Sequence, residues 1–64
     1  MFVNGERKSF EGEISVSELL TREGFDPGRV AVEVGGEIIP KKSYGNHMLR
    51  DGDKIEIVCF VGGG

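Results

Sequence analysis

One short segment, with a helix-start signal before it and a helix-stop signal after it, limits what this 64-residue chain can fold into. Ser15 to Glu18 reads as a capping box: the Ser15 hydroxyl can accept from the N–H of Glu18, whose carboxylate can reach back to Ser15. Gly24 is placed to end the helix in the left-handed conformation, and Pro27 prevents its continuation. The predicted helix, about 15–23, is too short to be stable alone and must pack on a sheet.

The helix has one apolar face on which it can pack. Val16, Leu19 and Leu20 follow the i, i+3, i+4 spacing of a buried stripe. Ile14 precedes the cap and is placed to form a hydrophobic staple with Leu19. Phe25, just beyond Gly24, can pack back on Leu20.

Two strand pairs flank this helix in the sequence. Asn4-Gly5 is a strong hairpin signal because both residues tolerate positive φ, so antiparallel strands are predicted at about 1–4 and 6–10. After the helix, 30–34 alternates valine with Ala31 and Glu33, as in a half-buried strand. Gly35-Gly36 then predicts a turn.

The segment 37–40 follows that turn as an edge strand, since Pro40 cannot donate to a ladder. Residues 41–50 are predicted to be irregular, with one helical turn around Ser43 to Gly45. Asp51 to Asp53 is predicted to form a tight turn into a last strand at 54–61.

The order β-β-α-β-β-β predicts a two-layer α+β fold, with one helix on one face of a mixed sheet of four to five strands. With the crossover placed between the second and third strands, the first and last strands can lie side by side at the centre. This is the β-grasp, or ubiquitin-like, topology. The expected domain spans 1–61, and its predicted core contains Leu19, Leu20, Val32, Val34, Ile55 and Ile57.

Composition argues against several functions. The net charge is −3, and no run of Lys or Arg exceeds two residues, so nucleic-acid binding is not expected. One cysteine excludes an internal disulfide, and a reduced, cytoplasmic setting is expected. No apolar run approaches the ~20 residues of a membrane span. No catalytic motif and no metal-ligand spacing is present, so we expect a monomeric protein that is not an enzyme and binds no cofactor or metal.

The last strand presents two different faces. One face, expected to be the core face, carries Ile55, Ile57, Cys59 and Val61. A free cysteine in a core behaves as a small hydrophobe, so Cys59 is expected to be buried and inert. The other face changes from polar to apolar along Lys54, Glu56, Val58 and Phe60. An exposed apolar pair beside the end of the chain predicts that Val58 and Phe60 dock a partner.

Three glycines follow this strand. Gly62, Gly63 and Gly64 have no side chains, so they are expected to form a flexible tail that can enter a narrow channel. The four residues after Phe60 can reach about 13–14 Å when extended. The expected role of this tail is to present the carboxylate of Gly64 to another protein's active site.

The chain resembles the ThiS family, the sulfur carriers of thiamin biosynthesis. The resemblance extends over nearly the whole chain and rests on the segments Phe2 to Gly5, Ser15 to Leu20, Val32 to Pro40, Asp51 to Val58, and Phe60 to Gly64. It implies that a ThiF-like adenylating enzyme consumes ATP to activate Gly64. A cysteine-derived sulfur donor then gives a thiocarboxylate, and a ThiG-like thiazole synthase takes the sulfur. Gly62 is one glycine more than the family's terminal pair.

Two alternatives remain at this point. The small subunit of molybdopterin synthase shares the fold and the glycine end, although its members are usually longer and tend to carry prolines before the tail. No proline follows Pro40 here. The other alternative is a ubiquitin-like binding module whose glycines are never activated.

Overall fold

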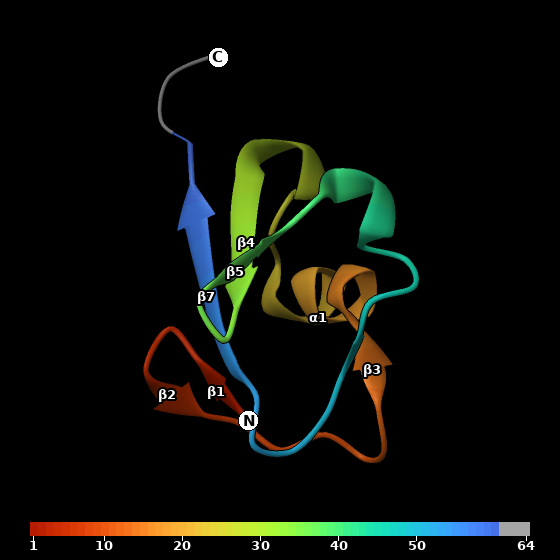
Figure 1. Cartoon of the computed structure of the whole chain (residues 1–64), viewed down its shortest axis with the longest axis vertical. Helices are drawn as coiled ribbons and strands as arrows, with labels where there is room; N and C mark the ends of the chain where they lie inside the picture. The colour runs from red at the N-terminus through yellow and green to blue at the C-terminus, as the bar shows by residue number, and fades with distance from the viewer. Residues whose placement is uncertain (61–64) are drawn as a thin grey trace.

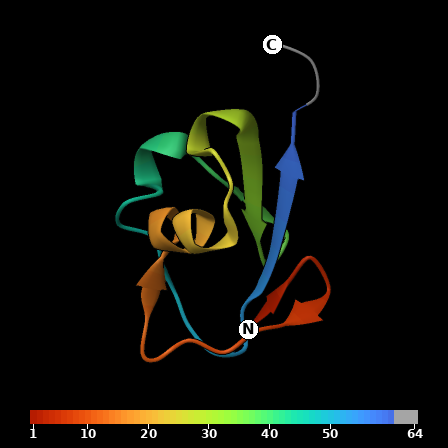
Figure 2. The ribbon, with the colours of Figure 1, turned by 180° about the vertical axis from the view of Figure 1, so that it is seen from behind.

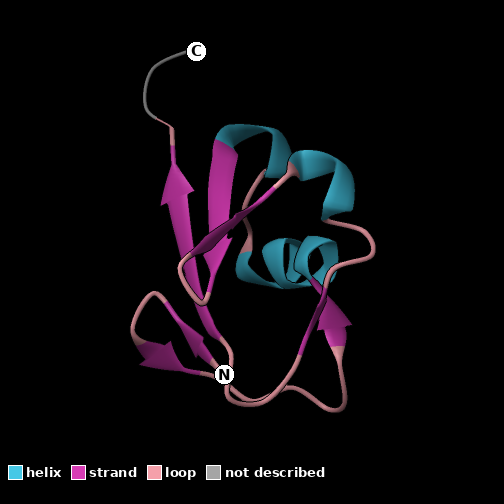
Figure 3. Cartoon of the chain, viewed as in Figure 1, coloured by secondary structure: helices cyan, strands magenta, loops and turns pink. Residues whose placement is uncertain are grey.

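In the part of the chain that the structure describes, a five-stranded mixed sheet has one α-helix, α1, against one of its faces. Figures 1 and 3 show this arrangement of helix and sheet. The computed structural model describes residues 1–60. Its elements are, in order, β1 (Phe2–Val3), β2 (Glu6–Arg7), β3 (Ile14–Ser15), α1 (Val16–Glu23), the 3-10 turn η1 (Pro27–Arg29), β4 (Val30–Val34), β5 (Glu37–Ile39), the 3-10 turn η2 (Lys41–Ser43), β6 (Met48–Leu49) and β7 (Lys54–Cys59). The predicted α+β class is confirmed.

The sheet order is β2-β1-β7-β4-β5. β1 lies parallel to β7, with Phe2 opposite Lys54, while β4 pairs antiparallel with both β7 and β5. The prediction that the first and last strands are neighbours is therefore confirmed, and the two views of the ribbon show them side by side (Figures 1 and 2). β5 is an edge strand, as the position of Pro40 indicated.

The N-terminal hairpin forms around Asn4 and Gly5, whose φ angles are 52° and 81°. These positive values are those of the tight turn that the Asn-Gly pair predicts. The Asn4 side chain also accepts a hydrogen bond from the N–H of Ile57 at 2.7 Å, so the turn is joined to the central strand. The strands are shorter than predicted, since β1 spans Phe2–Val3 and β2 spans Glu6–Arg7. One further bond, from the Lys8 N–H to the Met1 carbonyl, continues their pairing.

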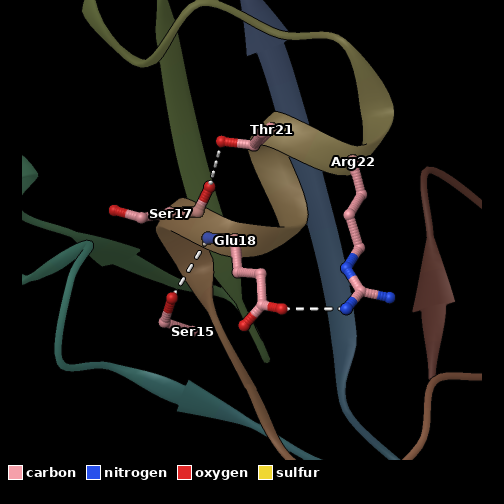
Figure 4. A network of polar contacts seen from close by, with 5 residues as sticks. All are labelled: Ser15, Ser17, Glu18, Thr21 and Arg22. Atoms are coloured by element: carbon pink, nitrogen blue, oxygen red, sulfur yellow. Dashed lines mark hydrogen bonds and ion pairs between the residues drawn. The ribbon is translucent and has the colours of Figure 1, made fainter.

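Helix α1 begins and ends where the sequence predicts. The Ser15 hydroxyl accepts from the Glu18 N–H at 3.0 Å (Figure 4). Gly24 has φ 79°, and its N–H bonds to the Thr21 carbonyl while the next N–H bonds to Leu20. These two backbone hydrogen bonds form a Schellman motif, which satisfies carbonyls that the end of the helix would otherwise leave unpaired.

The predicted return bond of the capping box, from the Ser15 N–H to the Glu18 carboxylate, is wrong. The Glu18 carboxylate accepts from Arg22 at 2.9 Å, one helical turn further on, and does not turn back to Ser15 (Figure 4). An i, i+4 ion pair between exposed side chains competes with the backbone N–H for the same carboxylate. Elsewhere in α1, Thr21 donates its hydroxyl to the Ser17 carbonyl at 3.1 Å.

The core lies between α1 and the sheet. Val16, Leu19 and Leu20 are fully buried, which confirms the predicted stripe. Of the predicted core residues only Val34 is half-buried, and it packs against the others from the margin. The buried apolar residues are Met1, Val3, Ile14, Val16, Leu19, Leu20, Val30, Val32, Ile39, Tyr44, Leu49, Ile55 and Ile57.

A second ladder was not predicted. β3 pairs antiparallel with β6, with Ile14 opposite Leu49. The helical turn expected around Ser43 to Gly45 lies earlier, at η2. Two-residue strands carry too short an alternation to be recognised in a sequence, and these form because the fold buries Ile14 and Leu49 together.

Lys8 joins the hairpin to the helix. Its Nζ lies 3.2 Å from the Glu23 carboxylate and 3.3 Å from that of Glu6. The hydrogen bond that Lys8 donates to Glu23, followed by the one that it donates to Glu6, raises the pKa of Lys8 above its ordinary 10.5. A raised pKa stabilises the fold while the amine is charged, and this contribution is lost only as the pH rises through the raised value. The link is therefore intact at neutral pH.

Candidate functional site

The far end of β7 is held in place by the two 3-10 turns. The Phe60 N–H donates to the Arg29 carbonyl at 2.8 Å, which continues the β4–β7 ladder by one step. Lys41 lies with its Nζ 5.7 Å from the centre of the Phe60 ring, within the range of a cation–π contact. The same Nζ donates to the Gly28 carbonyl at 3.0 Å. The backbone is therefore anchored as far as Phe60.

The predicted glycine tail lies outside the described residues. Val61, Gly62, Gly63 and Gly64 are not among residues 1–60, and neither is the predicted domain boundary at 61. Their proposed roles depend on where β7 directs the chain. In Figure 1 the arrow of β7 points away from the N-terminal hairpin and away from α1.

Val58 and Phe60 are exposed, as their alternation with the buried isoleucines predicts. Their exposed fractions are 52% and 56%, against 6% for Ile57, which lies on the opposite, core-facing side of β7. Val58 lies on the sheet face opposite α1, which we call the outer face. The strand register places on this face Phe2 and Arg7 of the hairpin, Ala31 and Glu33 of β4, Ile38 of β5, and Lys54, Glu56 and Val58 of β7.

The prediction for Cys59 is wrong, because its thiol is exposed. Cys59 does share a face with Ile57, and it stands opposite the buried Val30. However, β1 pairs only with Lys54 and Ile55, so the last part of β7 has β4 as its only neighbouring strand. Cys59 therefore lies at the margin of the sheet, where its side chain stays exposed although it points to the core side of β7.

Sequence reasoning missed the residues that hold Phe60. Arg29 and Lys41 are far from Phe60 in the sequence, and neither belongs to a motif. The short 3-10 turns that carry them meet the end of β7 only in the folded chain. The local signals of a turn at η1 are Pro27 at its start and Asp26 before it, whose side chain accepts from the Gly28 N–H.

No three His, Cys, Asp or Glu side chains within residues 1–60 gather as a metal site. His47, the single histidine of the sequence, is half-buried, and its backbone carbonyl accepts from the Val16 N–H at 3.0 Å. No helix in the described part is both long and apolar enough to cross a membrane.

Comparison with known proteins gives a match over the whole chain. The model of the ThiS family matches residues 1–64. The crystal structure of a thiamine biosynthesis protein (ThiS) from Geobacter metallireducens superposes with a TM-score of 0.83 at 32% identity, covering 98% of this chain and 96% of that one. The solution structure of a thiamine biosynthesis protein from the same organism gives a TM-score of 0.78.

Two kinds of curated relative match almost the full chain. A thiazole synthase of Paramagnetospirillum magneticum is 47% identical over 64 residues, which is all of this chain but 20% of that protein. The uncharacterized protein ycf40 of Porphyra purpurea is 32% identical over 62 residues, and the match covers 87% of its length. The chain therefore spans about one fifth of the thiazole synthases it matches, and most of the smaller relatives.

Proposed function

Because this chain belongs to the ThiS family, we propose that it is a sulfur carrier of thiamin biosynthesis. The observation that carries the proposal is the family match over all 64 residues. The structural similarity to a protein named for thiamine biosynthesis supports it, at a TM-score of 0.83. The thiazole synthases among the relatives favour the thiazole pathway over a pterin acceptor.

The proposed site of sulfur attachment is the carboxyl group of Gly64. A terminal carboxyl group has a pKa of about 3.3–3.7, so it is an anion at neutral pH and a poor electrophile. In the proposed reaction the carboxylate attacks the α-phosphorus of ATP and pyrophosphate leaves. Sulfur at the oxidation level of sulfide then attacks the acyl carbon, and AMP leaves with the C–O bond electrons. A thiocarboxylate results with no net oxidation or reduction.

The division of the chain into an anchored body and a short end suits this chemistry. The backbone is hydrogen-bonded up to Phe60, and Gly64 is the fourth residue after that point. We propose that Gly62 and Gly63 are required because a channel shaped for glycine admits no side chain. The proposal requires a free carboxyl group at Gly64.

Three partners follow from this proposal. A ThiF-like adenylating enzyme consumes the ATP, a cysteine-derived donor supplies the sulfur, and a ThiG-like thiazole synthase accepts it. The thiazole synthase has support from the relatives, in which a segment similar to this whole chain belongs to a protein of that name. The carrier itself performs no catalytic step, and the proposed reaction belongs in the cytoplasm.

The proposed function is tested by mass spectrometry. The full chain, incubated with ATP, the adenylating enzyme of the same genome and a sulfur donor, is expected to gain the mass difference between sulfur and oxygen, with fragments locating it at Gly64. Cys59→Ser is the matched control and is expected to convert equally. No mass gain with an enzyme that is active on its own carrier would contradict the carrier assignment.

Docking is expected to depend on Phe60. Phe60→Asp should keep the fold, since this side chain is 56% exposed, and should weaken binding to the adenylating enzyme by removing an apolar contact beside the tail. Met48→Asp is the matched control, because Met48 is also exposed but lies on β6, outside the five-stranded sheet. Titration calorimetry gives the affinities, and circular dichroism checks the fold. An unfolded Phe60→Asp variant, or equal weakening by both variants, would contradict this docking site.

A further inference from the structure

Two carboxylates face each other at the centre of the outer face. Glu33 of β4 and Glu56 of β7 are direct partners in the antiparallel register. The bonds at both ends of the ladder, from Gly35 to Lys54 and from Phe60 to Arg29, show that the even-numbered residues of β7 point their backbone groups toward β4. Glu33 and Glu56 therefore occupy a position of the ladder at which the two backbones are hydrogen-bonded to each other. Their side chains leave the same face of the sheet, with the Cβ atoms about 4.5–5.5 Å apart.

No cation within residues 1–60 lies close enough to either carboxylate to form an ion pair. The ion pairs of the structure involve other acids, and Lys54, the next residue on this face of β7, is not within 4.0 Å of either. Glu33 is also half-buried, so water screens this pair less than it would an exposed one. Like charges directly opposite each other destabilise a sheet.

Apolar side chains flank the pair on two sides, and Lys54 of β7 lies on the same face. Ile38, 71% exposed, is the β5 partner of Glu33, and Ala31 faces Val58 in the next row. An arrangement that lowers the stability of the free protein, at the centre of an exposed sheet face of mixed apolar and charged residues, is expected where a function requires it. What the described residues do not place within ion-pair distance of these two carboxylates is a positive charge. A partner that supplies this charge must place it beside apolar groups.

We propose that Glu33 and Glu56 together bind one arginine side chain of the thiazole synthase, and that the outer face around them is the docking face. A guanidinium has five donors in a plane, so it can bridge two carboxylates, and it is more weakly hydrated than a lysine ammonium. Thiazole synthase is the chosen partner because two relatives of this chain are thiazole synthases that contain a segment similar to it within one polypeptide. The inference rests on the proposed function, of which it specifies one interface.

The first part of the test needs only the carrier. Glu33→Gln and Glu56→Gln keep the side-chain shape and each removes one of the two repelling charges. Each is expected to raise the melting temperature by about 1–5 °C. The double variant should gain little beyond either single one, because the first substitution already removes the repulsion. Glu11→Gln, which makes the same change of net charge away from the sheet, should show no such gain.

The second part measures binding to the thiazole synthase of the same genome by titration calorimetry. Glu33→Gln and Glu56→Gln are expected to weaken the affinity about 10-fold and to reduce its dependence on salt, while Glu11→Gln binds as the original chain does. Thiocarboxylate formation is measured separately on each variant and should persist in all of them.

The outcomes separate the two proposals. Glutamine variants that are no more stable, or that bind thiazole synthase as tightly as the original chain, overturn the arginine site while the carrier function stands. Weakened binding to the adenylating enzyme alone overturns the choice of partner. An original chain that neither forms a thiocarboxylate nor binds thiazole synthase contradicts the proposed function itself.

Discussion

A chain extended by a short peptide after Gly64 is expected to form no thiocarboxylate at all. The extension turns the Gly64 carboxylate into an internal peptide carbonyl, which has no free oxygen anion to attack ATP. The fold should be unaffected, since the described backbone is anchored only as far as Phe60. The measurement is the intact mass after incubation with the adenylating enzyme, ATP and the sulfur donor.

The matched control restores the free end. If the extension is removed by a protease that cuts directly after Gly64, conversion should return to the original level. Gly63→Leu tests the channel separately, and we expect a folded but poor substrate because a branched side chain does not fit a passage shaped for glycine. The addition of one sulfur atom that persists in the extended chain but disappears in Cys59→Ser would instead indicate that the exposed Cys59 thiolate takes the outer sulfur of a donor persulfide, which leaves as a thiolate.

Leu20→Ala is expected to lower the free energy of unfolding by about 2–5 kcal/mol. Leu20 is a fully buried residue of α1 in the core, so its removal leaves a cavity between α1 and the strands. A chain this short buries a small core, and such a loss is a large part of its total stability. Urea unfolding followed by circular dichroism measures the difference.

Arg22→Ala is the control for that measurement. It lies in the same helix and removes an exposed ion pair with Glu18, which is worth about 0–1 kcal/mol. A small effect of both substitutions would mean that α1 contributes little to the core. A large effect of Arg22→Ala would mean that the exposed network in Figure 4 carries more of the stability than exposed ion pairs usually do.

The sequence alone determined the features that depend on a few neighbouring residues. Ser15 and Gly24 set the ends of α1 because a cap and a left-handed stop involve backbone groups within one turn. Asn4 and Gly5 set the first hairpin because their own φ angles define its turn. The exposure of Val58 follows from alternation along one strand. These local signals, in this order, also predicted the fold class.

Only the tertiary structure decided the features that depend on which strands meet and where their pairing stops. Cys59 has the predicted orientation but is exposed, because β1 ends its pairing at Ile55. β3 and β6 exist because the fold brings Ile14 onto Leu49. Glu33 and Glu56 face each other because the register aligns them. Such contacts join residues that are far apart in the chain. The local conformational preference of each residue does not determine which distant segment it will pair with.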